Sequence, residues 1–181
     1  MSLKQLIENC KRNDTKAQGQ LYQLYASKLF TLCLKYSKNY ADAEDNLQDA
    51  FITIFKKIDQ YNFKGSFEGW MKRIAVNTAL QRYRGTAVFD IVKEENISSV
   101  SVEIEDESLF NVDFLLQLIQ ELPDRYRLVF NLYALDGYTH KEIAGLLEIS
   151  EGTSKSNLAR ARLILKQKIE NYKASRNSHS L

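Results

Sequence analysis

Apolar residues recur every three or four positions along most of this chain, and very little interrupts them. Its 181 residues include one proline and seven glycines, and no stretch of any length alternates apolar and polar side chains as a half-buried strand does. Helix interiors exclude proline and disfavour glycine, so a chain poor in both suits long helices. The sequence therefore predicts an all-α fold, with enough chain for one domain or two small ones.

The first half of the chain predicts a compact helical domain over residues 1–84. Helices are expected over 3–13, from about 15 to 40, from about 41 to 58 and from 67 to about 84, with a loop at 61–66. The apolar residues predicted to face inward on the long second helix include Ala17, Leu21, Leu24, Tyr25, Leu29, Leu32, Cys33 and Tyr36.

Helical spacing is lost over residues 85–112, and the charge changes sign there. Residues 1–90 hold 14 Lys and Arg against 9 Asp and Glu, residues 91–112 hold 1 against 6, and residues 113–181 hold 10 against 8. We expect a flexible acidic linker between two small helical domains. Two basic blocks suit a protein that meets DNA at two places, although solvated helix faces give similar totals.

The second domain is expected over residues 113–175, followed by a disordered tail at 176–181. Helices are predicted over 113–121 and, after Pro123, over 124–135. The stretch 138–169 then reads as two helices across a tight turn, with Thr139 and Ser150 as their N-caps. On the second of these helices, one face is predicted to turn inward: Ser154, Leu158, Ala161, Leu165 and Ile169. This pattern favours a DNA-binding helix-turn-helix over an ordinary helical hairpin.

Several other classes of protein fit the sequence poorly. Cys10 and Cys33 stand at apolar positions, which predicts buried, reduced thiols, and with only His140 and His179 beside them no metal site is expected. No nucleophile–base pair or phosphate loop indicates an enzyme, and no cofactor is expected. Charged residues interrupt every apolar segment, so neither a signal peptide nor membrane insertion is predicted and the expected compartment is the cytoplasm.

Three stretches together resemble the extracytoplasmic-function (ECF) sigma factors of bacterial RNA polymerase. They are Asp42-Ala43-Glu44-Asp45 with Gln48-Asp49-Ala50-Phe51, then Phe63-Lys64-Gly65-Ser66-Phe67-Glu68-Gly69-Trp70 with Arg73-Ile74-Ala75-Val76-Asn77, and finally Leu122-Pro123 through Arg162. Their order and separation match the family over nearly the whole chain. The resemblance implies two helical domains, called regions two and four, core polymerase and promoter DNA as partners, and control by an anti-sigma factor.

The resemblance gives a role to an acidic helix face that would otherwise be read as solvated. It implies that Asp45, Gln48 and Asp49 dock on the clamp helices of the largest polymerase subunit.

Aromatic and cationic residues gather after the third predicted helix, where unstacked bases and phosphates are good partners for them. The residues predicted to contact the melted minus-ten strand are Tyr61, Asn62, Phe63, Lys64, Trp70, Lys72, Arg73 and Asn77. Within this set, the loop 61–66 is the better candidate for direct contact, and Trp70 is also interpreted as part of the core together with Phe67.

The resemblance further implies that the second helix of the helix-turn-helix reads the minus-thirty-five duplex. Its predicted contacts are Thr153, Lys155, Ser156, Asn157, Arg160 and Arg162. Gln81, Ser154 and Asn157 depart from the family pattern: Ser154 is expected to bond back to the backbone, and Asn157 to favour adenine. The alternative function is a stand-alone helix-turn-helix regulator that does not bind polymerase.

Overall fold

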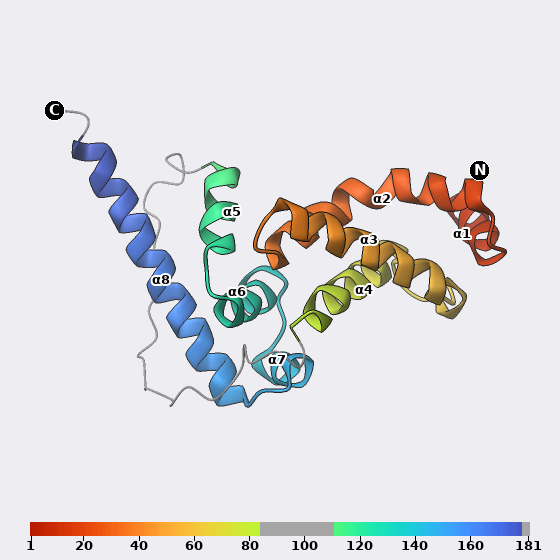
Figure 1. The fold of residues 1–181 in the computed structure, drawn as a ribbon. Coiled ribbons are helices and arrows are strands. Elements are labelled where there is room, and N and C mark those ends of the chain that lie inside the picture. The colour runs from red at the N-terminus through yellow and green to blue at the C-terminus, as the bar shows by residue number, and fades with distance from the viewer. Residues whose placement is uncertain (84–110, 179–181) are drawn as a thin grey trace. The chain divides into compact units, whose positions relative to one another are not determined.

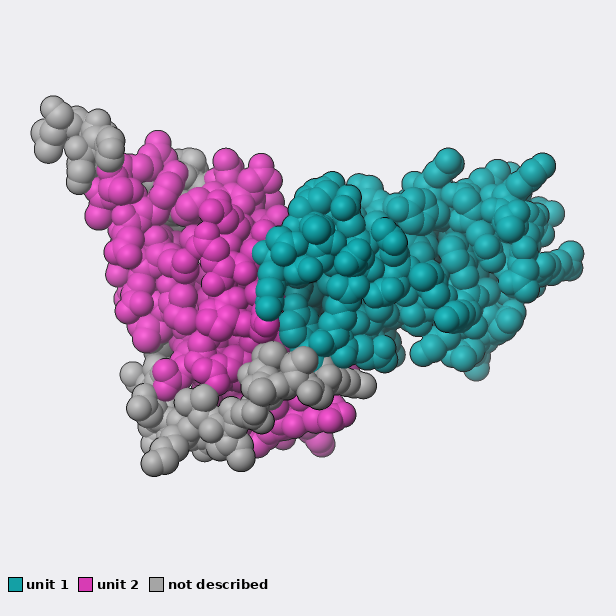
Figure 2. All heavy atoms as spheres, in the orientation of Figure 1, with its two compact units in different colours: residues 1–83 teal, residues 84–181 magenta. Residues whose placement is uncertain are grey.

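A computed structural model describes residues 1–83 and 111–178 of the chain, with side chains to residue 176. Every regular element within these ranges is helical, which confirms the predicted fold class. The chain divides into two compact units, residues 1–83 and residues 84–181 (Figure 2). The predicted linker at 85–112 lies outside the described residues except for Asn111 and Val112, which instead begin a helix.

Unit 1 consists of the helices that the sequence pattern predicted in order, together with a short 3₁₀ helix that it did not predict (Figure 1). Their bounds are α1 Leu3–Lys11, α2 Thr15–Tyr36, α3 Tyr40–Lys57, the short 3₁₀ helix η1 Ile58–Gln60, and α4 Phe67–Gln81. Polar side chains cap their first turns, as when Asp14 accepts from the backbone N–H of Ala17 and Ser66 from that of Gly69. α2, α3 and α4 pack against one another, while α1 packs on α2 and η1.

The core of unit 1 is apolar apart from one buried hydrogen-bonded link between α2 and α3. Asn46 Nδ2 donates to Ser37 Oγ at 2.7 Å, and that hydroxyl donates to the Cys33 carbonyl at 2.8 Å. Cys10 and Cys33 are free and buried, as predicted. Burial, which disfavours the thiolate, raises the pKa of Cys33 to about 12.

One inward prediction on α2 is wrong, because Leu24 is 61% exposed. At about 100° per residue, the buried residues Ala17, Leu21 and Cys33 define an arc of the helix, and Leu24 falls just beyond its edge. Apolar spacing identified the stripe but could not show how far the neighbouring helices extend around it.

Unit 2 contains three shorter helical segments and a helix-turn-helix, each with buried apolar residues. Its bounds are α5 Val112–Gln120, α6 Asp124–Phe130, the π-helical turn η4 Asn131–Leu135, α7 His140–Leu147 and α8 Glu151–Ser178. One buried cluster joins α5, α6 and α8, and its residues are Leu118, Leu122, Tyr126, Ala161, Leu165 and Ile169. α8 therefore continues past residue 175, where a disordered tail was expected to begin, and residues 179–181 lie outside the described residues.

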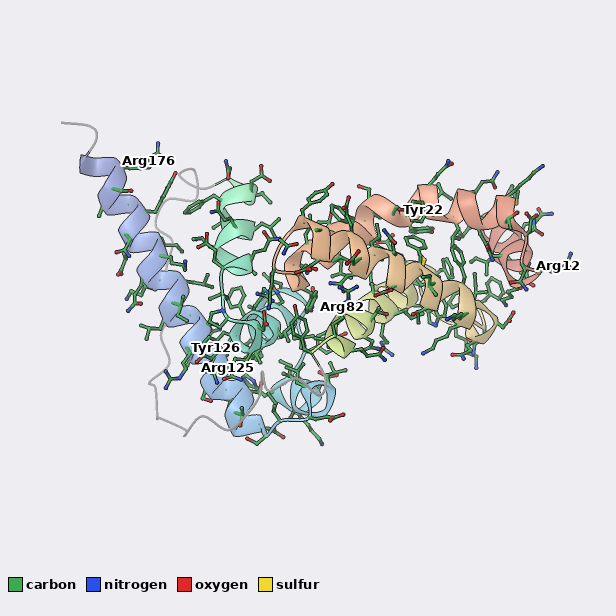
Figure 3. All side chains as sticks on the ribbon, viewed as in Figure 1. Arg12, Tyr22, Arg82, Arg125, Tyr126 and Arg176 are labelled. Carbon is green, nitrogen blue, oxygen red and sulfur yellow. The ribbon has the colours of Figure 1, made fainter. Side chains whose placement is uncertain are left out.

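A guanidinium group is buried inside unit 2. Arg127 is 1% exposed, and its Nη1 donates to the carbonyls of Gln120 at 3.2 Å and Leu122 at 2.9 Å, while its Nη2 pairs with Asp124. These bonds tie the end of α5 to the start of α6, next to Arg125 and Tyr126 (Figure 3).

None of the described helices is long and apolar enough to cross a membrane.

Candidate functional site

The predicted acidic face of α3 is accessible. Asp45, Gln48 and Asp49 are all exposed. Asp49 forms an ion pair with Arg82, with 2.8 Å between its Oδ2 and the Nη2 of the arginine. Both partners remain substantially in solvent, so the pair contributes little to stability and leaves the carboxylate available to a partner.

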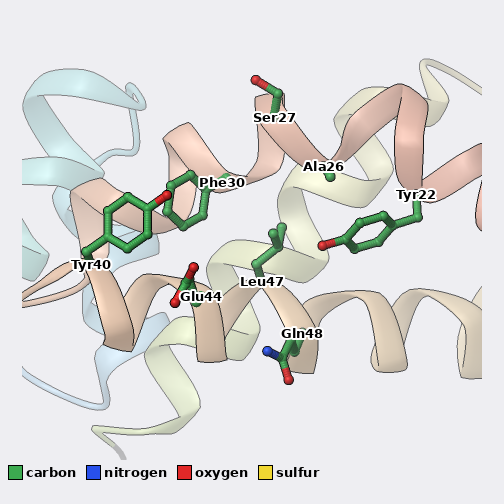
Figure 4. Close-up of a pocket in the computed structure, with 8 residues that line it drawn as sticks. All are labelled: Tyr22, Ala26, Ser27, Phe30, Tyr40, Glu44, Leu47 and Gln48. Atoms are coloured by element: carbon green, nitrogen blue, oxygen red, sulfur yellow. The ribbon is translucent and has the colours of Figure 1, made fainter.

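A hollow of about 450 Å³ lies beside this face, between α2 and α3. Tyr22 of α2 and Tyr40 of α3 stand at its two ends, 41% and 61% exposed (Figure 4). The remaining lining residues are Ala26, Ser27, Phe30, Glu44, Leu47 and Gln48. Gln48 joins the hollow to the acidic face. Sequence reasoning missed the contribution of α2, because the spacing of its aromatic residues does not reveal which of them the packing leaves open.

Tyr61 braces the loop before α4 from within. Its side chain is 5% exposed, its hydroxyl donates to the Gly65 carbonyl at 2.8 Å, and its ring lies 4.9 Å from that of Phe67 and 5.5 Å from that of Trp70. The burial of Tyr61 leaves little of its ring accessible in this structure, and its contact with DNA stays a prediction. The residues of the loop pack around the Tyr61 side chain.

Phe63 is the aromatic residue that this loop presents. It is 38% exposed and has a φ of 61°, a left-handed conformation that costs free energy for a bulky side chain. Asn62 Oδ1 accepts from the Lys64 N–H at 3.2 Å, and both residues are exposed. The structure thus brings together Asn62, Phe63 and Lys64 at one accessible turn.

The predicted contacts on α4 differ in how available they are. Arg73 is exposed, whereas Asn77 and Trp70 are half-buried, and the Trp70 ring stacks on Phe67 at 5.6 Å. Lys72 Nζ lies 2.8 Å from Glu68, which also pairs with Lys28. Hydrogen bonds from Lys72 and then Lys28 lower the pKa of Glu68 to about 2. The ammonium group of Lys72 is consequently already paired with Glu68 and is less available to DNA than that of a lysine in solvent.

The helix-turn-helix has the predicted caps. Thr139 and Glu142 form a capping box at the start of α7, in which the Thr139 N–H donates to Glu142 Oε2 at 2.8 Å. α7 ends at Glu148, which has a φ of 57°. Ser150 Oγ accepts from the Thr153 N–H at 2.9 Å and starts α8.

A side-chain contact joins the two helices of this motif. Ser154 is fully buried, and its Oγ lies 2.9 Å from His140 Nδ1, so it bonds across to α7 and the expectation that it bonds back to its own backbone is wrong. The imidazole stacks on Tyr133 at 4.4 Å, and Arg162 lies 6.0 Å over that tyrosine ring. Burial above all, together with nearby Lys155, lowers the pKa of His140.

Most of the predicted contacts on α8 are accessible to some degree. Lys155 is exposed, and four others are half-buried: Thr153, Ser156, Arg160 and Arg162. Asn157 is 6% exposed, and the contact of its amide with a base stays a prediction. The buried face of α8 is therefore wider than predicted, because it includes both Asn157 and Leu158.

Comparison with known proteins matches these two units to two family models. The model described as Sigma-70 region 2 matches residues 21–88, and the model described as Sigma-70, region 4 matches residues 115–165. The ECF RNA polymerase sigma factor SigW of Bacillus subtilis is 30% identical over 93% of this chain and 97% of its own length. The ECF RNA polymerase sigma-E factor of Escherichia coli is 31% identical over 91% of this chain and 93% of its own.

A solved structure has a similar fold. It is that of the sigma factor RpoE from Bartonella quintana in complex with the anti-sigma factor NepR. The two structures align with a TM-score of 0.52 and 23% sequence identity. The alignment covers 84% of this chain and 96% of the Bartonella chain.

The order of the two regions and the identity with full-length relatives define the class: the chain belongs to the ECF RNA polymerase sigma factors. The alternative of a stand-alone helix-turn-helix regulator is not supported, because it leaves the region 2 match of unit 1 unexplained.

Proposed function

We propose that the chain docks on core RNA polymerase through α3 and carries two separate DNA-binding surfaces to a promoter. The match of region 2 and region 4 to different units carries this proposal, since each unit then supplies one promoter contact. Support within unit 1 comes from the exposure of Asp45, Gln48 and Asp49 and from the neighbouring hollow with its two exposed tyrosines. The chain itself is proposed to act in the cytoplasm without catalysis or a cofactor, because polymerisation belongs to its partner.

The accessible turn Asn62–Lys64 is proposed to hold a base of the melted minus-ten strand, with Arg73, Lys72 and Asn77 of α4 along the strand. An exposed aromatic ring beside cations suits an unstacked base and its phosphates. Unit 2 is proposed to place α8 in the major groove of the minus-thirty-five duplex, with Lys155 and Arg162 on phosphates and Thr153, Ser156 and Arg160 nearer the bases. We propose an anti-sigma factor as a further partner, a kind of complex that the Bartonella protein forms.

Transcription from a genomic promoter library, with bacterial core polymerase plus this chain, tests the proposal. Specific initiation from a set of promoters sharing two elements is the expected result. A chain that binds DNA without polymerase, and supports no initiation with it, contradicts the proposal.

Charge reversal tests the docking surface within the same assay. Asp45→Lys with Asp49→Lys is expected to weaken binding to core polymerase roughly 100-fold or more, because like charges then meet across the interface. Asp59→Lys makes the same change at an exposed position of η1 and serves as the control. Unchanged co-purification of the doubly reversed variant with core polymerase contradicts the assignment.

A further inference from the structure

α1 brings two lysines to the exposed aromatic ring of the loop before α4. Lys11 Nζ lies 4.7 Å from the centre of the Phe63 ring, and Lys4 Nζ lies 5.7 Å from it. The two lysines are seven residues apart, which places them two turns apart on one face of a helix. α1 reaches the loop because it packs on η1, the element that leads into it.

Phe63 keeps part of its ring exposed although its backbone has an unfavourable conformation. A left-handed φ of 61° is unfavourable for a phenylalanine, and yet the ring is 38% exposed. The hydrogen bond from Tyr61 to the Gly65 carbonyl and the cap of Asn62 on Lys64 over-determine the turn. A residue held in a strained conformation with part of its ring exposed suits a binding position.

We propose that Lys4 and Lys11 complete a nucleotide-binding site with Phe63, in which a base of single-stranded DNA stacks on the ring and the two ammonium groups move onto the flanking phosphates. Both lysines lie before residue 21, where the region 2 match begins, so the family match gives them no role. Each ammonium presently meets the π-electrons of the ring, and Lys11 also meets Glu8 at 3.2 Å. A phosphate offers these cations a full negative charge in exchange.

This inference rests on the proposed function, since it needs the loop to face the melted strand. The assay uses the full chain bound to bacterial core polymerase. Its probe is a labelled oligonucleotide carrying the non-template strand of a promoter found in the library assay. Affinity is measured over a range of salt concentrations.

Lys4→Gln with Lys11→Gln is expected to lower the slope of log affinity against log salt concentration by about 1.4, from about 0.7 for each phosphate contact with a single strand. Phe63→Ala is expected to lose roughly 5- to 160-fold in affinity with the slope unchanged. Lys4→Arg with Lys11→Arg keeps both charges and is expected to keep the slope. Lys16→Gln removes one charge from an exposed lysine of α2, serves as the control and is expected to behave as wild type.

Three outcomes distinguish a failure of this inference from a failure of the proposed function. A double glutamine variant with the slope of the Lys16→Gln control overturns the role of Lys4 and Lys11, even if Phe63→Ala weakens binding. Equal loss in the glutamine and arginine variants also overturns it, because the lysines then act through packing. Wild-type holoenzyme that fails to bind any promoter strand contradicts the proposed function itself.

Discussion

His140 is a partly buried imidazole whose neutral form the structure favours, and this has a measurable consequence. Its pKa is lowered by burial first and then by Lys155, with an opposing effect of Glu151 and a smaller lowering effect of Arg162. The folded state therefore binds its proton less readily than the unfolded state, so stability is lost as pH falls below the ordinary histidine pKa of about 6.5. Protonation keeps the contact with Ser154 possible, since a hydroxyl accepts as well as donates.

Replacing this imidazole is expected to flatten the pH dependence of stability. The free energy of unfolding of wild type should fall between pH 7 and pH 5, and His140→Gln should remove up to about 1.4 kcal/mol per pH unit of that slope. Denaturant unfolding followed by circular dichroism at several pH values measures it. Ser154→Ala keeps the titrating group and serves as the comparison. Equal slopes for wild type and His140→Gln would show that His140 has the same pKa in both states.

Single residues were where the sequence predicted the candidate site least well. Tyr61 and Asn157 are residue types that contact nucleic acid, and both are buried. The Tyr61 ring lies against Phe67 and Trp70, and the periodicity of the sequence did not show that contact. Exposure at Phe63, Asp45 and Lys155 agrees with the predicted surfaces. Their contacts with DNA and polymerase stay predictions.

Arg127 acts at the scale of elements, because it fastens α5 to α6. Its guanidinium is almost fully buried, so its removal takes a donor away from two carbonyls and a cation away from Asp124. Arg127→Met is expected to cost about 3–5 kcal/mol in the free energy of unfolding of unit 2.

The measurement is urea unfolding of the full chain, and two further variants make it specific. Arg127→Lys should recover only part of the loss, since an ammonium group lacks the planar fork that reaches several acceptors. Arg125→Met removes a neighbouring half-buried guanidinium that lies over Tyr126 and should cost less than about 1 kcal/mol. A cost for Arg127→Met no larger than for Arg125→Met would contradict the structural role of the buried arginine.

Helix starts were predictable from the sequence because capping is local. Asp14, Thr139 and Ser150 each accept the N–H bonds that their residue types favour, within three positions along the chain. The π-helical turn at Asn131–Leu135 was not predicted, since tertiary packing and not the sequence period decides such a change of winding. The same limit applies to the hollow between α2 and α3, which depends on how two helices meet.

For the whole molecule, the assignment of one task to each unit predicts separable defects. Lys155→Ala with Arg160→Ala is expected to weaken recognition of the upstream duplex about tenfold and to reduce its salt dependence, while binding to core polymerase stays at the wild-type level. Footprinting of the upstream element and co-purification with core polymerase measure the two properties.

The reversed α3 variant should show the complementary defect, with polymerase binding lost. A loss of polymerase binding in the Lys155/Arg160 variant would contradict this division of labour.

Fold class and the order of the two units followed from apolar spacing and charge along the chain, because both are properties of long segments and average over single misjudged residues.

The ring packing around Trp70 makes unit 1 optically distinct. Trp70 is the only tryptophan in the chain, and it lies 5.6 Å from Phe67 and 5.5 Å from Tyr61, on the inner side of the turn that carries Phe63. Selective excitation of indole therefore reports on this turn alone. Tryptophan emission therefore offers a label-free signal for the binding of a DNA strand at the loop. Unit 2 has no tryptophan and adds no background to this signal.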